Sequence, residues 1–362
     1  MRDIRISIAV ITSLLVCIGV VMIFSSSSVY ALKVLGSSTY FLHRHLLFLS
    51  IGIILTIAVM TIDYRDLQDL AKPLLIIAIV ALVFVLIPGI GKESYGARRW
   101  FKLGMFSVQP SEFAKIAMLL YISDFLSRKQ GKIRDFKEGF MPPLLVLGVI
   151  CLLILKQPDL GTSVFIAAIT LLMMFIAGAR VAHLGVLVLA ALPAIYLLVA
   201  KVPYRMARIM AFLDPWRDSQ GIGFQLSQSQ IALGSGGLFG VGLGHSMQKL
   251  FYLPAAHTDF IFSIIGEELG LVGTLTVIVL FVLFIWQAAR IAKRTTNSFG
   301  YYLSLGVVLM IGLQTVINIG VSMGVFPTKG LPLPFISYGG SALMANLVAV
   351  GLLLNVSRTQ EL

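Results

Sequence analysis

Long uninterrupted apolar runs constrain this chain more than any other feature of its sequence. The first extends from Ile6 to Phe24 without a charged residue, and similar runs recur to the end of the chain. A membrane-spanning helix needs about 20 predominantly apolar residues. Of all residues, 58% are hydrophobic and 12% are charged, whereas an ordinary soluble domain is about 25% charged. A water-soluble fold cannot bury so many apolar side chains, so the sequence predicts an integral membrane protein.

Hydropathy, with glycine, proline and charge marking the ends of each run, predicts an all-α fold of about ten transmembrane helices. The predicted spans are 6–27, 46–62, 73–89, 109–127, 141–155, 160–178, 183–200, 260–287, 300–323 and 338–357. We expect residues 1–362 to form a single polytopic membrane domain. The first run lacks a clear signal-peptide cleavage site, so we interpret it as a retained helix.

Orientation follows from the basic residues next to the spans. An even number of spans puts both termini on one side. About half of the 28 Lys and Arg residues fall on that side, so their total does not decide the orientation. The short segments 128–137 and 290–294 are the densest basic clusters beside span ends, and the positive-inside rule gives such clusters the most weight. They predict that both termini are cytoplasmic.

The segment 201–258 separates the seventh and eighth predicted spans. It is too polar to span and too apolar to be disordered, and it holds a glycine-rich run, 234–244, after an amphipathic stretch, Phe224 to Leu233. Such a stretch suits the membrane interface. We therefore predict a large extracytoplasmic loop.

Basic residues on the predicted outer side are not explained by topology. They lie between the third and fourth spans and in the long loop. A basic surface that faces away from the cytoplasm suits an anionic head group such as a diphosphate, although anchoring to lipid head groups would explain it equally well. The candidates are Arg98, Arg99, Arg205, Arg208 and Lys249.

Few ionisable residues lie within or beside the predicted spans, where their cost in lipid makes them functional candidates. Glu112 and Lys115 are three apart on one helix and can pair, which helix packing alone would also explain. Asp159 follows Gln157-Pro158 at the start of the sixth span, as a helix N-cap would.

Asp259 directly precedes the eighth span, at its predicted outer mouth, with His257 beside it. Glu267 and Glu268 follow about two turns later. Carboxylates that continue down a helix from a basic outer loop form a polar seam, which a lipid-facing helix would not tolerate. We therefore favour a functional role for these residues over a structural one.

The segment from Phe326 to Ser341 contains three prolines, which forbid a continuous helix. Small residues follow where the tenth span begins, and a helix N-terminus of that kind is suited to binding an anion. The candidate anion-binding residues of this segment are Lys329, Ser337, Tyr338, Gly339, Gly340 and Ser341.

These motifs together resemble the SEDS (shape, elongation, division and sporulation) family, the group of RodA, SpoVE and FtsW. The resemblance covers essentially the whole chain and is carried by the segments 221–229, 251–262, 266–270 and 327–341. The segments 248–252 and 327–330 resemble the FtsW and SpoVE branch. Family members often carry Glu before the Ala-His-Thr-Asp stretch, whereas this chain has Ala255 and Ala256.

The resemblance implies a peptidoglycan glycosyltransferase of the bacterial inner membrane that polymerises lipid II. It also implies a class B penicillin-binding protein as the partner transpeptidase, other membrane proteins of the division or elongation complex as further partners, and no nucleic acid. By the same resemblance, Asp259 matches the family's essential extracytoplasmic aspartate.

The chemistry of the residues agrees with that role. A lipid diphosphate is already a good leaving group, so one carboxylate can suffice as a general base on the incoming 4-hydroxyl, while cations stabilise the diphosphate. A divalent cation, Mg²⁺ or Mn²⁺, could share that task through Asp259, but the sequence shows no ligand spacing for a metal.

Two other classes stay open at this point. A lipid II flippase would use the same basic cavity, with Glu112, Lys115, Glu267 and Glu268 along a path through the bundle. A non-catalytic scaffold of the division complex would need neither a base nor a path.

Overall fold

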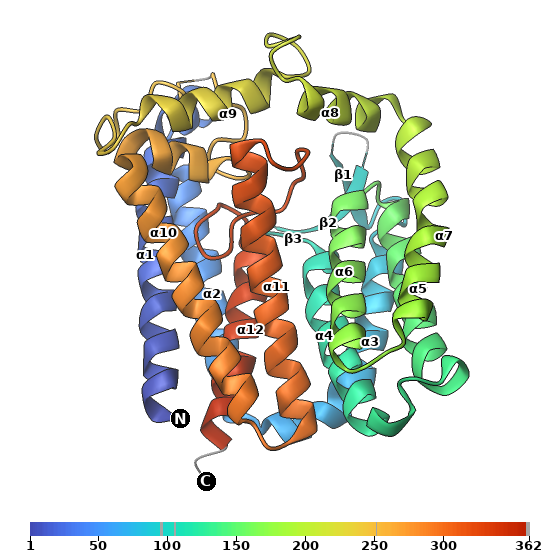
Figure 1. The fold of residues 1–362 in the computed structure, drawn as a ribbon. Coiled ribbons are helices and arrows are strands. Elements are labelled where there is room, and N and C mark those ends of the chain that lie inside the picture. The colour runs from blue at the N-terminus through green and yellow to red at the C-terminus, as the bar shows by residue number, and fades with distance from the viewer. Residues whose placement is uncertain (95–96, 105, 251, 360–362) are drawn as a thin grey trace.

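The apolar runs fold into long helices that stand side by side (Figure 1). A computed structural model of the chain describes residues 1–94, 97–104, 106–250 and 252–359. The long helices are α1 (Arg2–Leu35), α2 (Tyr40–Thr61), α3 (Tyr64–Phe84), α4 (Pro110–Arg128), α5 (Met141–Lys156), α6 (Leu160–Ile176), α7 (Val181–Ala200), α10 (Ile261–Arg294), α11 (Ser298–Met323) and α12 (Gly340–Thr359). A single 3-10 turn, Gln130–Lys132, and a π-helical turn, Phe136–Phe140, lie between α4 and α5.

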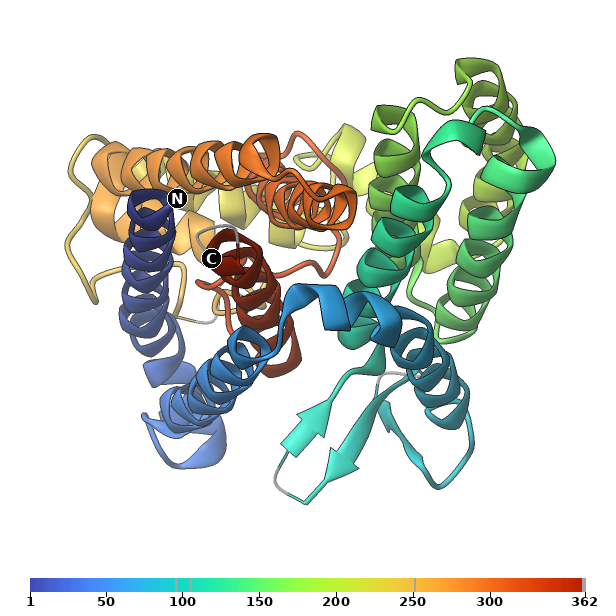
Figure 2. The ribbon, with the colours of Figure 1, turned by 90° about the horizontal axis from the view of Figure 1, so that it is seen from below.

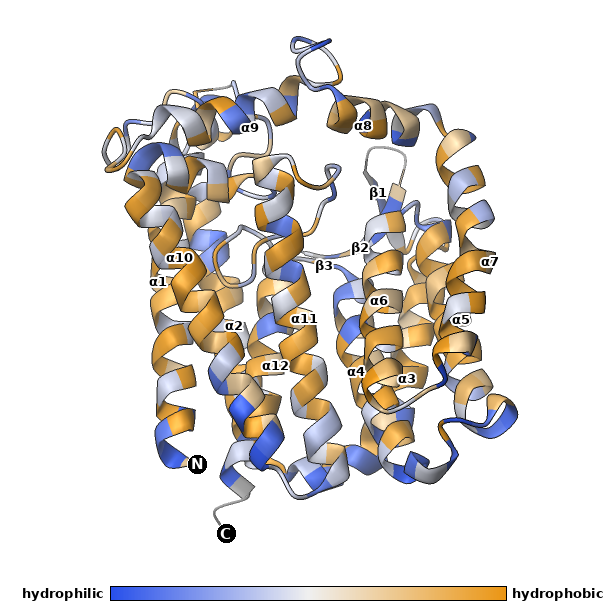
Figure 3. Ribbon diagram, viewed as in Figure 1, coloured by the Kyte–Doolittle hydropathy of each residue, from blue (hydrophilic) through white to orange (hydrophobic). Residues whose placement is uncertain are grey.

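The chain is a multi-pass membrane protein, and each predicted apolar range overlaps one of these helices. Eight helices of the described chain are long and apolar enough to cross a membrane. One of the eight is the continuous helical stretch Phe136–Lys156, which joins the π-helical turn to α5. The eight exclude α6, which has 17 residues, and α4, which carries several charged side chains. Figure 3 shows the apolar residues concentrated along the helices, with hydrophilic residues gathered in the loops at their lower ends. The predicted count of ten spans stays a prediction.

The predicted bounds of the third span, 73–89, were wrong. Helix α3 begins nine residues earlier, at Tyr64, because the carboxylate of Asp63 accepts a hydrogen bond from the N–H of Arg65 and caps its first turn. Pro73, which we took as a boundary, lies inside the helix.

The helices form two groups (Figure 2). Helices α1, α2, α10, α11 and α12 pack together, and α3 to α7 form the second group. Contacts of α4 with α11 and α12 join the groups. Both termini lie at one end of the bundle, together with the basic segments that follow α4 and α10 (Figure 1).

Shorter elements cover the other end, which we call the distal end (Figure 1). Helices α8 (Pro203–Leu213) and α9 (Phe224–Ser235) lie across it and belong to the predicted long loop. A three-stranded antiparallel sheet, β1 (Gly91–Ser94), β2 (Ala97–Leu103) and β3 (Phe106–Val108), was not predicted. The stretch Phe224 to Leu233, which we predicted to be amphipathic, lies in helix α9.

Helix α10 is broken near its distal end. Gly270 has φ 65° and ψ −160°, far from helical values, so the helix has a short segment before it and a long one after it. Such a break leaves carbonyl oxygens before it and N–H groups after it without helical partners. These groups need other partners if they are buried.

A glycine-rich segment that precedes α10 supplies those partners. We call Gly236–Gly244 the strap. The N–H groups of Val241 and Gly242 donate to the carbonyl oxygens of Glu267 and Glu268, at 2.9 and 3.0 Å. Beyond the break, the N–H groups of Leu271 and Val272 donate to the carbonyl oxygens of strap residues 237 and 238, at 2.9 and 3.2 Å. The strap therefore closes the break from both sides.

Glycine at position 240 is required by this close approach. Its φ is +78°, and a Cβ atom there would overlap the carbonyl oxygen of Glu268. Gly244 has a similar φ of +81° but no neighbouring atom near the Cβ position.

We expect Gly244→Ala to cost about 1–2 kcal/mol from the backbone conformation alone. Gly240→Ala is expected to cost at least about 2 kcal/mol more, because the strap must also move away. Denaturant unfolding of both variants in detergent tests this difference, and equal losses would contradict it.

Candidate active site at the distal end

Asp259 lines a cavity of about 400 Å³, which we call the distal cavity. Its walls come from α2, the sheet, the start of α4, the segment before α10 and the segment before α12. The lining residues are Arg44, Phe48, Lys92, Trp100, Ser107, Gln109, Glu112, Thr258, Asp259, Gly330, Pro332, Tyr338, Gly339, Gly340 and Ala342. Residues from five separate parts of the chain thus line one cavity together with this carboxylate.

The backbone around Asp259 is tied to its surroundings by Asn318 of α11. The side-chain amide of Asn318 donates to the carbonyl oxygens of Asp259 and Leu331, at 3.0 and 2.8 Å. A Cβ atom on Gly330 would lie 3.7 Å from Asp259 Oδ2, so the backbone of this neighbouring segment runs close to the carboxylate. Asn318 therefore fixes the carboxylate relative to the segment that carries Lys329.

A second tie joins the segment of Asp259 to the start of α12. The N–H of Tyr338 donates to the carbonyl oxygen of His257 at 2.9 Å. The ring of His257 packs against Phe41, with ring centroids 4.6 Å apart, and against Tyr338 at 5.7 Å. Burial lowers the pKa of His257 to about 4, so the imidazole is neutral at physiological pH and contributes packing rather than charge.

The carboxyl group of Asp259 binds its proton more tightly than an exposed aspartate does. Burial raises its pKa to about 6, and the nearby guanidinium of Arg208 acts in the opposite direction. A carboxylate with such a pKa is a stronger base than an exposed aspartate and is still mostly ionised at neutral pH.

Four cations lie on the wall of the distal cavity or on the segments next to it, and Arg208 is the one that acts on the pKa of Asp259. Arg44 and Lys92 line the distal cavity, and the guanidinium of Arg44 also donates to the hydroxyl of Tyr40 at 2.8 Å. Arg208 of α8 donates to the carbonyl oxygen of Thr328 at 3.2 Å. Lys329, next to Thr328, is half-buried, and burial lowers the pKa of its ammonium group.

Three of the predicted outer cations have local partners. Arg98 pairs with Glu93 across the hairpin at 3.0 Å. Arg99 donates to the carbonyl oxygens of Gln157 and Pro158, at 2.8 and 2.6 Å, and thereby ties β2 to the α5–α6 turn. Arg205 donates to the carbonyl oxygen of Leu198 at 2.8 Å, near the end of α7. None of the three is among the residues described as lining the distal cavity.

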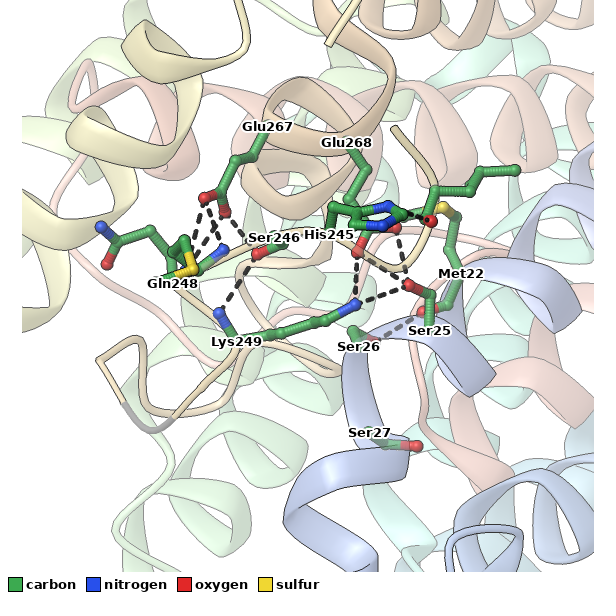
Figure 4. Close-up of polar contacts among 12 residues, drawn as sticks. Met22, Ser25, Ser26, Ser27, His245, Ser246, Gln248, Lys249, Glu267 and Glu268 are labelled. Carbon is green, nitrogen blue, oxygen red and sulfur yellow. Dashed lines mark hydrogen bonds and ion pairs between the residues drawn. The ribbon is translucent and has the colours of Figure 1, made fainter. Parts of the chain in front are cut away.

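Lys249, also predicted as a substrate ligand, is instead buried in an ion pair (Figure 4). Its ammonium lies 2.7 Å from Glu268 Oε1 and 3.1 Å from the hydroxyl of Ser25. The same hydroxyl donates to Glu268. This network joins α1, α10 and the segment that follows the strap.

Glu267 points to the same segment (Figure 4). Its carboxylate accepts from the hydroxyl of Ser246 and from the N–H of Met247, the latter at 2.9 Å. Glu267 and Glu268 therefore hold the chain between the strap and Asp259, and neither lines the distal cavity. The structure does not bring the predicted polar seam together as one surface.

Ser337 and Ser341 of the anion-binding candidates make backbone contacts. The hydroxyl of Ser337 accepts from the N–H of Leu333 at 2.8 Å, and that of Ser341 accepts from the N–H of Gln109 at 2.9 Å. Tyr338, Gly339 and Gly340 line the cavity. The start of α12 is thus part of the cavity wall, while its serines hold neighbouring segments in place.

The two remaining predicted polar features have the expected local structure. Lys115 and Glu112 pair at 2.6 Å in a buried position, and Glu112 also lines the distal cavity. Asp159 caps α6 by accepting from the N–H and the hydroxyl of Thr162, at 3.1 and 2.9 Å.

Sequence reasoning missed Arg44 and Asn318. Arg44 stands just before an apolar run, where it looks like an ordinary flanking charge. Asn318 lies in an apolar span four residues after Gln314, whose amide donates to the carbonyl oxygen of Pro332 at 2.7 Å. Two amide side chains on one helix face within a span were a usable signal, since polar groups in a span need buried partners.

The fold and site define a class: a multi-pass helical membrane protein with a carboxylate and several cations at one end of the bundle. The family model described as cell cycle protein, which covers FtsW, RodA and SpoVE, matches residues 5–362. The chain belongs to this family, as the sequence motifs predicted.

Its relatives agree with the predicted branch. A probable peptidoglycan glycosyltransferase FtsW of Trichlorobacter lovleyi is 47% identical over 94% of this chain and 89% of its own length. Stage V sporulation protein E of Bacillus subtilis is 46% identical over 97% of this chain and 96% of its own length.

Solved structures show the same fold. The rod shape determining protein RodA of Thermus thermophilus is 29% identical, with a TM-score of 0.73 over 98% of this chain and 97% of its own. A chain from a peptidoglycan synthase complex, solved to show the structural coordination of polymerization and crosslinking, is 29% identical with a TM-score of 0.78, over 99% of this chain and 98% of that chain.

The Lys249–Glu268 pair allows a test of its structural role. Lys249→Met or Glu268→Gln alone leaves a buried charge unpaired, which is expected to cost about 3–5 kcal/mol. The double variant should lose clearly less than the sum of the two. As a matched control, Arg98→Gln removes an exposed ion pair and should cost under about 1 kcal/mol. Unfolding midpoints in detergent measure all four, and additive single losses would show that the two side chains do not act as a pair.

Proposed function

We propose that this chain polymerises lipid II into the glycan strands of peptidoglycan, with Asp259 as the general base. One observation carries the proposal: the half-buried carboxylate of Asp259 opens onto a cavity whose wall also holds Arg44 and Lys92. Membership of the family and the names of the relatives, probable peptidoglycan glycosyltransferases, support the same activity.

The distal end would face outward from a bacterial inner membrane, with both termini in the cytoplasm. The basic segments that follow α4 and α10 support this orientation, because they lie at the end of the bundle that carries the termini. The distal cavity would then receive a substrate whose sugars lie outside the membrane and whose isoprenoid chain stays in the lipid.

In the proposed reaction, Asp259 takes the proton of the acceptor's 4-hydroxyl as its oxygen attacks C1 of the donor sugar. The bond from C1 to the diphosphate breaks, and the lipid diphosphate leaves with its electron pair. Arg44 and Lys92 are positioned on the cavity wall to stabilise the charge on that leaving group. No general acid is needed, since a diphosphate leaves as a stable anion.

A divalent cation, Mg²⁺ or Mn²⁺, remains a proposal for this site. Among the described residues no three His, Cys, Asp or Glu side chains come together as a metal cluster. Mg²⁺ does not require such a cluster, because it is usually held by one or two carboxylates together with substrate phosphates. Asp259 would be its protein ligand, and the ion would neutralise charge on the diphosphate.

We also propose that a class B penicillin-binding protein crosslinks the strands that this chain makes, alongside other membrane proteins of division or elongation. The likeness to a chain from a peptidoglycan synthase complex supports such a partner.

The flippase alternative has less support, because Glu267 and Glu268 are engaged away from the cavity in the described structure. A non-catalytic scaffold would not need the raised pKa of Asp259.

Replacement of Asp259 tests the catalytic role. Asp259→Asn keeps the shape of the side chain but cannot accept a proton, so polymerisation of purified lipid II should fall by about 10²- to 10⁴-fold. Asp159→Asn is the matched control, because asparagine caps a helix as well as aspartate does. It should leave the rate nearly unchanged. Polymerisation that survives Asp259→Asn would remove Asp259 as the base.

The pH dependence of the rate gives an independent test. The base must be ionised, and its pKa is raised to about 6, so the rate should fall as the pH drops through about 6 rather than about 4. Arg208 lowers this pKa, so Arg208→Gln should move the fall to higher pH. Initial rates from pH 4 to 8, with unfolding checked at each pH, measure both effects. A fall near pH 4, or an unmoved one in Arg208→Gln, would contradict this account.

A further inference from the structure

The strap carries apolar side chains that contact little of the protein. Its backbone is bound to α10, but Leu238, Phe239, Val241 and Leu243 are 46–80% exposed. The other residues of the strap are glycines, so the segment holds no charged or polar side chain. Single exposed apolar residues are ordinary, whereas several within one short segment indicate a surface that an apolar partner covers.

This surface continues an apolar face of α10. Beyond the break, Leu271, Leu275, Val279 and Val282 follow one another at helical spacing, and all four are exposed. In a membrane protein, an exposed apolar stripe along a span faces the hydrocarbon chains of the lipid. The strap accepts hydrogen bonds from the N–H groups of Leu271 and Val272, so it lies at the distal end of this stripe.

Two helices set the depth of the strap in the membrane. On α10, Gly270 is 20 residues from Arg290, which lies in the basic cluster at the end of the bundle that carries the termini. On α1, Ser25 is also 20 residues from a basic residue, Arg5, and its hydroxyl binds Glu268 beside the break. A helix rises 1.5 Å per residue, so both separations equal about 30 Å, the thickness of the hydrocarbon core. The strap therefore lies at the boundary between lipid chains and head groups.

Non-helical backbone is costly at this depth unless its polar groups have partners. The strap meets this condition. The carbonyl oxygens of Gly237 and Leu238 accept from α10, and the N–H groups of Gly240, Val241 and Gly242 donate to carbonyl oxygens at 2.8–3.0 Å. The polar groups of the strap are thus used within the protein, while its apolar side chains stay exposed.

We propose that the strap is a membrane-inserting element, with Leu238 and Phe239 among the lipid chains of the leaflet at the distal end. The partner is lipid rather than a second protein, because the surface is uncharged, continues the stripe of α10 and lies at the boundary depth. Insertion holds the broken end of α10 at a fixed height. Asp259 lies just before the short segment of α10, so the bilayer surface helps to set the height of the distal cavity. The inference does not depend on the proposed polymerase activity.

A spin label measures the depth of the strap. In a chain with Cys17→Ser and Cys151→Ser, Phe239→Cys carries a nitroxide, and the purified protein is placed in vesicles of phosphatidylethanolamine and phosphatidylglycerol. Collisions with oxygen, which concentrates in lipid, are compared with collisions with a nickel chelate, which stays in water. The label at position 239 should favour oxygen and lie about 5–10 Å into the boundary between head groups and lipid chains.

Two matched labels bracket this result. Val282→Cys, on the exposed stripe of α10, should place the nitroxide deeper in the lipid. Arg217→Cys, in the exposed turn between α8 and α9 that rises above the rest of the distal end (Figure 1), should place it in water. Leu243→Cys repeats the measurement if Phe239→Cys does not fold. A strap label as open to the nickel chelate as the label at 217 would overturn the proposal. A label shielded from both oxygen and nickel would show contact with a second protein molecule and would overturn it as well.

Discussion

The break in α10 at Gly270 is the constraint on which the distal end depends. A helix interrupted within a membrane protein must find new partners for its freed backbone groups, since lipid offers none. The strap provides them on both sides of the break, and glycine at position 240 allows its backbone to reach the carbonyl oxygen of Glu268. The short first segment of α10 is thereby fixed in place. Asp259, two residues before that segment begins, takes its position from it.

Side chains on other helices complete this support. The carboxylate of Glu268, whose backbone the strap contacts, pairs with Lys249 and accepts a hydrogen bond from Ser25. Because Ser25 belongs to α1, this contact ties the first segment of α10 to α1. On the opposite side, Asn318 binds the backbone of Asp259 and of the segment before α12. The carboxylate is therefore held through its backbone by buried hydrogen bonds, while its oxygens remain available to the cavity. A group that must meet two substrates benefits from this arrangement, because its position does not depend on either of them.

Sequence patterns predicted the local features well and the long-range ones poorly. The apolar runs located the helices, and the Pro158-Asp159 pattern predicted the cap on α6, because both depend on neighbouring residues. The predicted role of Asp259 came from its place before a span and from the family resemblance, and it stays a prediction. No local pattern reveals that Lys249 pairs with Glu268, or that Arg99 binds carbonyl oxygens in the α5–α6 turn, because these partners meet only after folding. The basic character of the outer loops therefore overstated the number of cations at the cavity.

The half-burial of Asp259 would reconcile two demands on the general base that we propose. A fully exposed aspartate keeps a pKa near 4 and is a weak base, whereas a carboxyl group sealed in an apolar interior stays protonated and cannot reach substrate. Burial raises the pKa of Asp259 to about 6, and Arg208 keeps it from rising further. The group is then about as basic as it can be while remaining ionised at neutral pH. Arg208 is in turn held by the carbonyl oxygen of Thr328, so the segment before α12 helps to set the basicity of Asp259.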